Sequence, residues 1–267
     1  MTDTVKSLLQ AGMEAAYING STAVDPVYKP EFVTNDRLSG KKVLSSVEEE
    51  LLRCDRFEIS VAFITLGGIT PLLQTLKELE KKNIPGRILT TNYLSFSEPK
   101  ALEKLHELKN ITIKMYDAEA ADTGFHTKGY IFKKNEVYRI IIGSSNMTST
   151  ALSSNWEWNT KLVSAERGEV ALQVIKEFEN LWGCKYALDY EQFYDIYKER
   201  YQIIKHQREV AKKEEIPSFE KYTLKPNSMQ ERFISGLRKI VEAGEDRALL
   251  ISATGDDAII QTGRKAA

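Results

Sequence analysis

His126-Thr127-Lys128-Gly129-Tyr130-Ile131-Phe132 and Tyr138-Arg139-Ile140-Ile141-Ile142-Gly143-Ser144-Ser145-Asn146 are two apolar segments separated by Lys133-Lys134-Asn135-Glu136, and they predict a pair of adjacent strands. Residues two apart on a strand point to the same face, so we expect His126 and Lys128 to lie side by side. The end of the second strand adds the Ser144 hydroxyl and the Asn146 amide to the same rim. These groups are sufficient to cut a phosphodiester without a metal ion, because the imidazole is a nucleophile and the ammonium holds phosphate.

His126 is one of only three histidines in the chain. A single histidine on a strand is more often structural than catalytic, so the interpretation depends on its neighbours. Lys128 supplies a point positive charge for a phosphate oxygen, and the Asn146 amide can donate to the same oxygens. His106 and His206 have no such partners, so we interpret both as surface residues.

Glu157 follows the second strand and lies between Trp156 and Trp158. It is either a partly exposed acid on a loop or the acceptor that orients the His126 ring through its second nitrogen. Ser144 either hydrogen-bonds phosphate or shapes the turn. The two tryptophans belong either to the core or to the rim of the site, where they could stack on a base or sugar.

Together these residues resemble the signature of the phospholipase D superfamily, H-x-K-x4-D followed by G-S-x-N and a downstream Glu. The matching residues are His126, Lys128, Gly143, Ser144, Asn146 and Glu157. Lys133 stands where the family has Asp, a position that is usually structural and that nuclease branches often lack. The resemblance covers roughly residues 35 to 185, and it implies a DNA nuclease more strongly than a lipid enzyme.

The resemblance also implies how the chain assembles. The family mechanism needs two histidines at one phosphate: one attacks phosphorus to form a phosphohistidine, and the other protonates the leaving oxygen and later activates water. The chain carries one H-x-K motif, that of His126 and Lys128, so the second histidine must come from another copy. A twofold homodimer with one composite site on its axis is therefore expected.

Composition places the chain among ordinary globular proteins. It has 267 residues, a net charge of −1 and two cysteines, Cys54 and Cys184, which we interpret as small core residues rather than a disulfide or a zinc site. The near-neutral charge argues against a globally basic nucleic-acid binder but allows a local positive groove. No apolar run is long enough for a membrane span and no signal-peptide pattern is present, so we expect a cytoplasmic protein without membrane contact, cofactor or metal.

Strands and helices alternate along most of the chain, which predicts a mixed α/β sheet with helices on both faces and a helical C-terminal extension. Expected strands cover residues 57–64, 87–91, 111–116, 126–132, 138–142 and 160–164. Expected helices cover residues 4–16, 43–52, 70–82, 98–108, 167–182 and 189–215. Ser45 or Ser46 should cap the helix at 43–52, with acids in its first turn, and Pro71 should open the helix at 70–82.

The C-terminal part divides further. Residues 1–187 form the expected phosphodiesterase domain and residues 188–217 a charged helical linker, which is either solvated or contacts a nucleic-acid backbone through Arg200, Lys205, Arg208 and Lys212. Residues 218–267 resemble the truncated start of a superfamily-two helicase, with Gln230 as the adenine-reading residue. Alternatively they form an unrelated small subdomain.

The helicase resemblance stops after Ala253-Thr254-Gly255. The Gly-Lys-Ser/Thr of a Walker A loop is replaced by Asp256-Asp257-Ala258, whose carboxylates would repel nucleotide phosphate. We therefore expect a fragment in which a nuclease domain precedes the edge of a helicase domain and residues 256–267 look foreign.

The sequence thus favours a metal-independent DNA endonuclease from a bacterial restriction or repair helicase, with the helicase domain of the full-length chain and DNA as partners. A second hypothesis is a catalytically silent module that binds DNA and dimerises. A third is a phospholipid-hydrolysing enzyme, for which an apolar interfacial loop or signal segment is expected, and neither is visible in the sequence.

Overall fold

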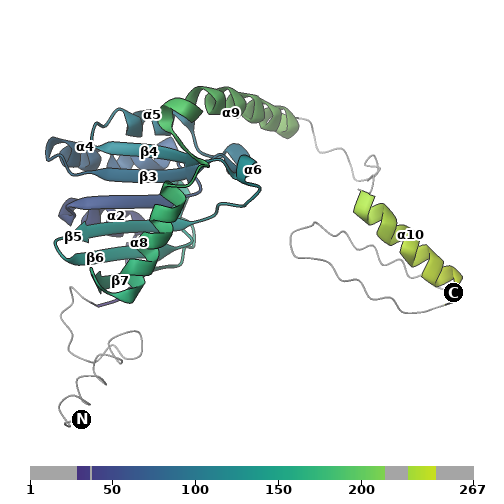
Figure 1. Ribbon diagram of the computed structural model, residues 1–267, viewed down its shortest axis with the longest axis horizontal. Coiled ribbons are helices and arrows are strands. Elements are labelled where there is room, and N and C mark those ends of the chain that lie inside the picture. The colour runs from purple at the N-terminus through teal and green to yellow at the C-terminus, as the bar shows by residue number, and fades with distance from the viewer. Residues whose placement is uncertain (1–28, 37, 214–227, 245–267) are drawn as a thin grey trace, which may run out of the picture. The chain divides into compact units, whose positions relative to one another are not determined.

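The computed structural model describes residues 29–36, 38–213 and 228–244 (Figure 1). In this part of the chain, eight strands form one sheet in the order β1-β7-β6-β5-β2-β3-β4-β8. The strands are β1 (Glu31–Val33), β2 (Arg56–Val61), β3 (Gly86–Thr91), β4 (Ile111–Tyr116), β5 (Lys128–Lys134), β6 (Val137–Gly143), β7 (Asn159–Ala165) and β8 (Ala187–Asp189). The β2–β3 and β3–β4 pairs are parallel and the other pairs are antiparallel. The predicted mixed sheet is confirmed.

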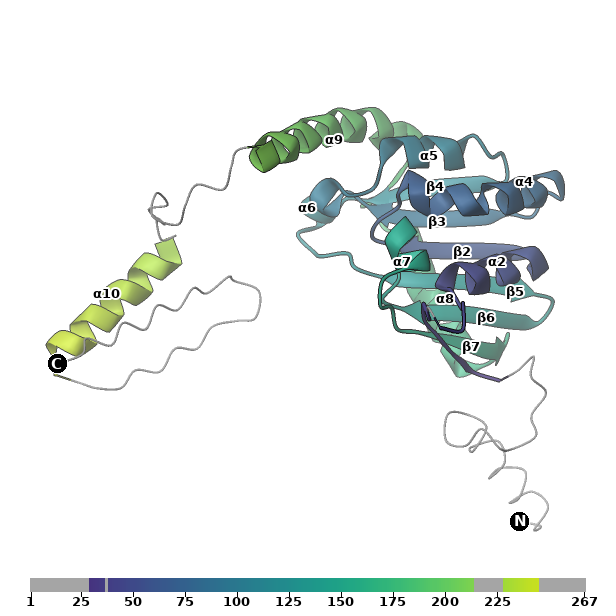
Figure 2. The same ribbon diagram turned by 180° about the vertical axis from the view of Figure 1, so that it is seen from behind.

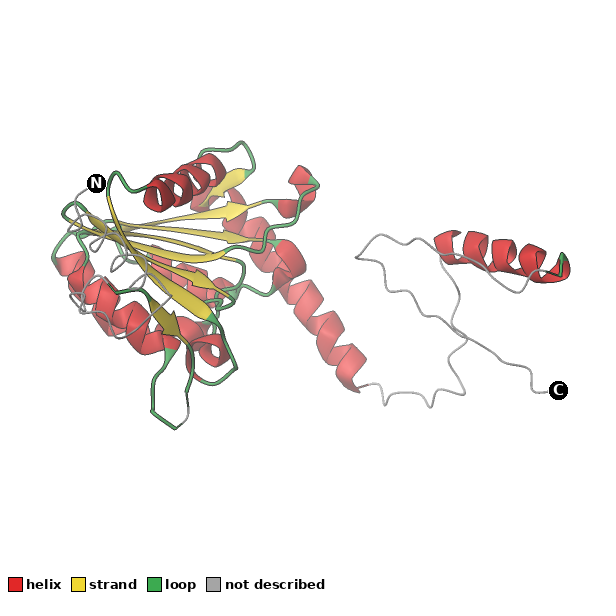
Figure 3. Ribbon diagram, turned by 90° about the horizontal axis from the view of Figure 1, so that it is seen from below, coloured by secondary structure: helices red, strands yellow, loops and turns green. Residues whose placement is uncertain are grey.

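Helices cover both faces of this sheet (Figure 3). Figure 1 shows α8 (Glu169–Trp182) on one face, and the reverse view in Figure 2 shows several helices on the other. These are α2 (Val43–Arg53), α4 (Leu73–Lys81), α5 (Pro99–His106) and α7 (Ser149–Ser153). The remaining short helices of this unit are α3 (Leu66–Ile69), η3 (Thr70–Leu72), η4 (Tyr93–Ser95) and α6 (Ala118–Ala121).

Each face has its own apolar core. On the α8 face, Ala171 and Phe178 pack in one cluster with Leu89 and Ile140 of the sheet. On the opposite face, the larger cluster combines the sheet with the apolar sides of α2, α4 and α5. Apolar residues at helical spacing, such as Val43, Val47 and Leu51 of α2, are fully buried there. The central strands β2 and β3 are buried along most of their length, because helices cover both faces of the sheet.

The helix predicted for residues 189–215 is α9 (Tyr190–Lys213). Its first turns are part of the larger core, because Phe193 and Tyr197 are buried there. The Tyr197 hydroxyl donates a 2.7 Å hydrogen bond to the carbonyl of Ser97. The residues that follow contain α10 (Ser228–Glu242), which includes Gln230. The helix predicted for residues 4–16 lies outside the described residues, as do residues 247–255.

Several predicted details are wrong. Neither Ser45 nor Ser46 caps α2, because the helix already starts at Val43. The backbone N–H of Val43 donates a hydrogen bond to the side chain of Asn35. The first turn of α2 contains no acidic residue. The helix predicted for 70–82 is divided into η3 and α4, with Pro71 in η3. Two short edge strands, β1 and β8, were not predicted, since three residues are too few to show a period of two.

Candidate active site

The site lies where β5 begins and β6 ends. The two strands are antiparallel, with Gly129 opposite Ile142, so the start of β5 is beside the end of β6. Gly143 ends β6 opposite Asn159 of β7. A Cβ at Gly143 would lie 2.2 Å from the Trp158 carbonyl oxygen, so only glycine allows this close approach. This contact brings the loop before β7 against Ser144.

His126 lies two residues before β5, so its predicted place on a strand is wrong. β2 ends at Val61, which pairs with Lys128, so no neighbouring strand continues the ladder to His126. The Lys128 ammonium still lies close to His126, because its Nζ donates a 2.9 Å hydrogen bond to the backbone carbonyl of His126. Thr127, between them, is held by a 2.5 Å hydrogen bond between its hydroxyl and that of Ser60.

The pKa values of both basic side chains at this edge, His126 and Lys128, are lowered. Partial burial and the nearby Lys128 ammonium lower the pKa of His126 below its ordinary value of 6.5. Burial also lowers the pKa of Lys128, and the negative charge of Glu157 opposes that shift. Among the described residues, no ion pair involves Lys128. The edge thus presents a largely neutral imidazole beside a positive charge with no carboxylate bound to it.

Phe63, which follows β2, connects His126 to Asn146. Its ring lies edge-on to the imidazole at a centroid distance of 6.2 Å, and its backbone N–H donates a 3.1 Å hydrogen bond to Asn146 Oδ1. The carbonyl oxygen of the amide is thus occupied, and Nδ2 remains as the donor for a bound oxygen. Sequence reasoning missed Phe63, and no local signal marks it, because its partners lie far along the chain, with Asn146 83 positions later.

Glu157 is buried, and its partners differ from the prediction. Its Oε2 accepts hydrogen bonds from the hydroxyls of Ser144 and Ser145. None of the hydrogen bonds among the described residues joins Glu157 to His126, so the predicted orienting contact is absent from the single chain. The Ser144 hydroxyl also accepts from the Trp158 backbone N–H at 3.0 Å, which fixes the loop around Glu157. In this arrangement Glu157 holds the Gly143–Asn146 turn and places a negative charge near Lys128.

The other residues singled out in the sequence lie outside this cluster. Trp156 and Trp158 are 86% and 72% exposed, so they are rim residues and the core interpretation is wrong. Lys133 lies at the opposite end of β5 and pairs with Glu166 at 2.5 Å. The change from the family Asp therefore falls away from the site. His106 stacks on Tyr190, with ring centroids 3.7 Å apart.

The part of the chain that the structure describes contains no group of three or more His, Cys, Asp or Glu side chains arranged to hold a metal ion. The same described residues also contain no helix with the length and apolar character that crossing a bilayer requires.

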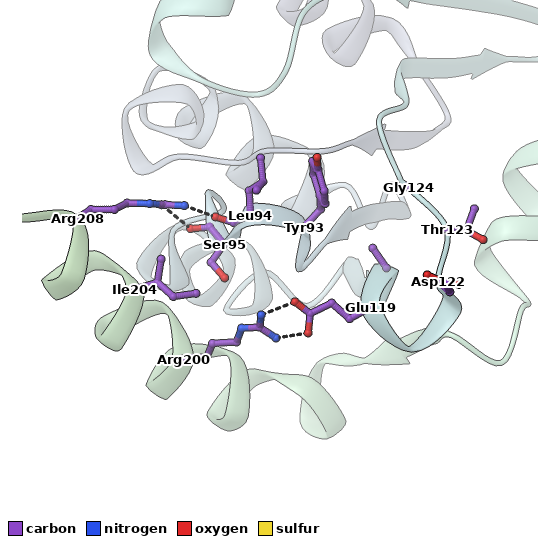
Figure 4. A pocket seen from close by; sticks show the side chains of 11 residues that line it. Tyr93, Leu94, Ser95, Glu119, Asp122, Thr123, Gly124, Arg200, Ile204 and Arg208 are labelled. Carbon is purple, nitrogen blue, oxygen red and sulfur yellow. Dashed lines mark hydrogen bonds and ion pairs between the residues drawn. The ribbon is translucent and has the colours of Figure 1, made fainter. Parts of the chain in front are cut away.

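A loop beside the site exposes the apolar side chains of Tyr93, Leu94 and Phe96. The expectation that the chain has no exposed apolar loop is therefore wrong. The loop borders a pocket of about 520 Å³ that is also lined by Glu119, Asp122, Gly124, Arg200, Ile204 and Arg208, among others (Figure 4). Arg200 is bound to Glu119 and Arg208 to the carbonyl of Leu94, so two of the four basic residues predicted to contact nucleic acid bind the domain itself.

Comparison with known proteins agrees with this architecture. Residues 53–182 match the family model described as "Cardiolipin synthase, PLD-like domain". No curated protein sequence matches the chain.

Solved structures with similar folds have low sequence identity to the chain. NucT from Helicobacter pylori is 13% identical, with a TM-score of 0.47, and the match covers 60% of this chain and 98% of NucT. Nuc from Salmonella typhimurium, a phospholipase D family member, is 15% identical with a TM-score of 0.45, covering 61% and 99%. Phosphatidylserine synthase from Haemophilus influenzae Rd KW20 is 12% identical with a TM-score of 0.47, covering 79% and 55%.

Proposed function

We propose that the phospholipase D-like domain is a metal-independent phosphodiesterase that cleaves DNA through a phosphohistidine on His126. Attack by the imidazole nitrogen forms the N–P bond as the bond from phosphorus to the leaving oxygen breaks. A second imidazole, in its protonated form, gives its proton to that oxygen, and water then cleaves the N–P bond. Lys128 and the Asn146 amide hold the nonbridging oxygens as negative charge increases in the transition state.

One observation carries this proposal: an unpaired Lys128 lies beside a His126 whose pKa is lowered. A nucleophilic imidazole must be neutral, and a phosphate site needs a positive charge that is not already held in an ion pair. Phe63 supports the same assignment, because it contacts His126 and also fixes the Asn146 amide. Glu157 is a positioning residue in this scheme, since it acts through Ser144, Ser145 and the charge near Lys128.

The second histidine comes, in this proposal, from a second copy of the chain. The resemblance of residues 224–255 to a helicase supports DNA as the substrate and a helicase domain as the partner in a restriction or repair protein. The alternative, a catalytically silent module that binds DNA and dimerises, predicts the same binding without any turnover.

Turnover in the presence of EDTA tests the proposal. The full chain should cleave a phosphodiester at an undiminished rate after chelation, because Lys128 supplies the positive charge that a metal ion would otherwise provide. A brief acid-free quench should trap on His126 the strand that remains bonded to phosphorus, and His126→Ala should remove both this covalent adduct and the activity. Activity that EDTA abolishes and magnesium restores would rule out the phosphohistidine mechanism, and binding without turnover would favour the silent module.

A further inference from the structure

The loop at residues 93–96 is held in an unfavourable conformation beside the site. Leu94 and Ser95 have φ values of 54° and 46°, which non-glycine residues rarely adopt. Tyr93, Leu94 and Phe96 are 41%, 50% and 43% exposed. Large apolar side chains on a strained loop reduce solubility and stability, so the rest of the fold must hold this loop in place.

Arg208 of α9 provides that support. One of its nitrogens donates a 2.5 Å hydrogen bond to the carbonyl of Leu94 (Figure 4). Its guanidinium carbon lies 4.3 Å from the centroid of the Phe96 ring. No ion pair among the described residues involves Arg208, so its positive charge is uncompensated. A planar cation stacked on an aromatic ring is a surface on which a nucleobase can stack.

The stack continues toward the proposed nucleophile. Phe96 contacts Phe63 edge to face, with ring centroids 5.0 Å apart, and Phe63 contacts His126 in the same way at 6.2 Å. Gly124, which also lines the pocket, is two residues from His126. The pocket is therefore next to the position where the scissile phosphate would bind.

We propose that this pocket binds an unpaired nucleobase of single-stranded nucleic acid, with Arg208 and Tyr93 of its lining and the neighbouring, half-exposed Phe96 ring as the stacking surface. This inference rests on the proposed function, and it names the substrate class as single-stranded. In a duplex, the bases are stacked and paired, so a base next to the cut cannot enter the pocket unless it first leaves the helix.

Charge in the pocket selects this occupant over a lipid. The lining includes Glu119, Asp122 and Arg200 around the apolar loop, and Glu119 is bound to Arg200 through two hydrogen bonds (Figure 4). An acyl chain would remove these charged groups from water without giving them hydrogen bonds, which is costly. A nucleobase has apolar faces for the rings and polar edges for the charged groups.

Binding to matched strands tests the inference. Affinity is measured in the full chain with His126→Ala, which prevents cleavage, for a short oligonucleotide, its abasic counterpart and its duplex. The strand with bases should bind about fivefold to fiftyfold more tightly than the abasic strand, the range expected from one stacked base. Phe96→Leu and Arg208→Lys should reduce this preference, whereas Phe96→Tyr should retain it. Leu172→Ala, which removes an exposed apolar side chain on α8, is the control.

The outcomes separate this inference from the proposed function. Equal affinity for strands with and without bases, or a preference that survives Phe96→Leu, would overturn the nucleobase pocket even if the chain with His126 intact cleaves both strands. A preference for bases in a chain that cleaves no diester would support the nucleobase pocket and contradict the proposed phosphodiesterase activity. Anionic phosphatidylglycerol vesicles provide the last comparison: vesicle binding that Phe96→Leu abolishes would assign the loop to a membrane and overturn the inference.

Discussion

At the scale of single residues, the protonation of His126 is the property most directly open to measurement. Burial and the Lys128 charge both favour the neutral imidazole, so its pKa lies below 6.5. A nucleophilic His126 must be neutral. Activity should therefore fall as the pH decreases through the lowered pKa, and the acid limb of kcat/KM should lie below pH 6.5.

Replacing Lys128 should move this titration. In Lys128→Gln the nearby positive charge is absent, so the pKa of His126 should rise part of the way toward its ordinary value, while burial still lowers it. An NMR titration of the imidazole measures the change without relying on activity. Lys134→Gln, at the other end of β5, is the control and should leave the titration in place. An imidazole that titrates identically in all three proteins would contradict the electrostatic coupling.

Gly143 gives a second prediction at this scale. In Gly143→Ala the new methyl group would overlap the Trp158 carbonyl and the Cα of Asn159, so β6 and β7 must separate. We expect a loss of about 1 to 3 kcal/mol in the free energy of unfolding, together with loss of activity as the turn at Ser144 moves. Denaturant unfolding measures the first effect. Gly129→Ala is the matched control, because nothing lies within 4 Å of a Cβ there, and equal stability of the two variants would refute the steric argument.

At the scale of elements, the first turns of α9 pack in the larger apolar core together with the sheet. Phe193 is 4% exposed in the larger core, whereas Ile196, on the same helix, is 73% exposed. Phe193→Ala should lower the free energy of unfolding by about 3 to 5 kcal/mol, because it leaves a cavity in the core. Ile196→Ala should change it by less than about 0.5 kcal/mol. Thermal and chemical unfolding of both variants check the difference.

The same contacts bear on the proposed domain boundary at residue 187. A chain that ends there lacks Phe193, Tyr197 and Arg208, so it should unfold at a lower denaturant concentration than one that ends at residue 213. Equal stability of the two chains would show that residues 188–213 do not stabilise the domain and act only as a linker.

At the scale of the whole molecule, the composite site makes activity depend on assembly. His126→Ala should reduce turnover by roughly a thousandfold or more, because nucleophile and acid are lost together. Mixing this variant in excess with the wild-type chain should lower activity per wild-type subunit, since heterodimers have only one histidine at the shared phosphate. Sedimentation and a diesterase assay on the exchanged mixture measure both properties.

Two results would contradict the composite site. One is a monomer with full activity. The other is activity that only dilutes in proportion to the wild-type chain after subunit exchange has been verified.

The sequence by itself determined the elements and the local cluster of groups. Strand and helix periods locate most of the sheet, and one hairpin places Lys128 near Gly143 because their separation along the chain is short. The positions of His126, Lys128, Ser144 and Asn146 at one edge could therefore be predicted. These features depend on side-chain period and turn residues, which are local properties of the chain.

Only the tertiary structure decided the contacts between distant segments. The serine partners of Glu157, the role of Phe63, and the burial of Phe193 follow from how the sheet, loops and helices pack. Arg208 and Leu94 are 114 positions apart, yet their contact forms one wall of the pocket. No local pattern encodes such contacts, because they arise from the joint packing of apolar surfaces and the need of buried polar groups for partners.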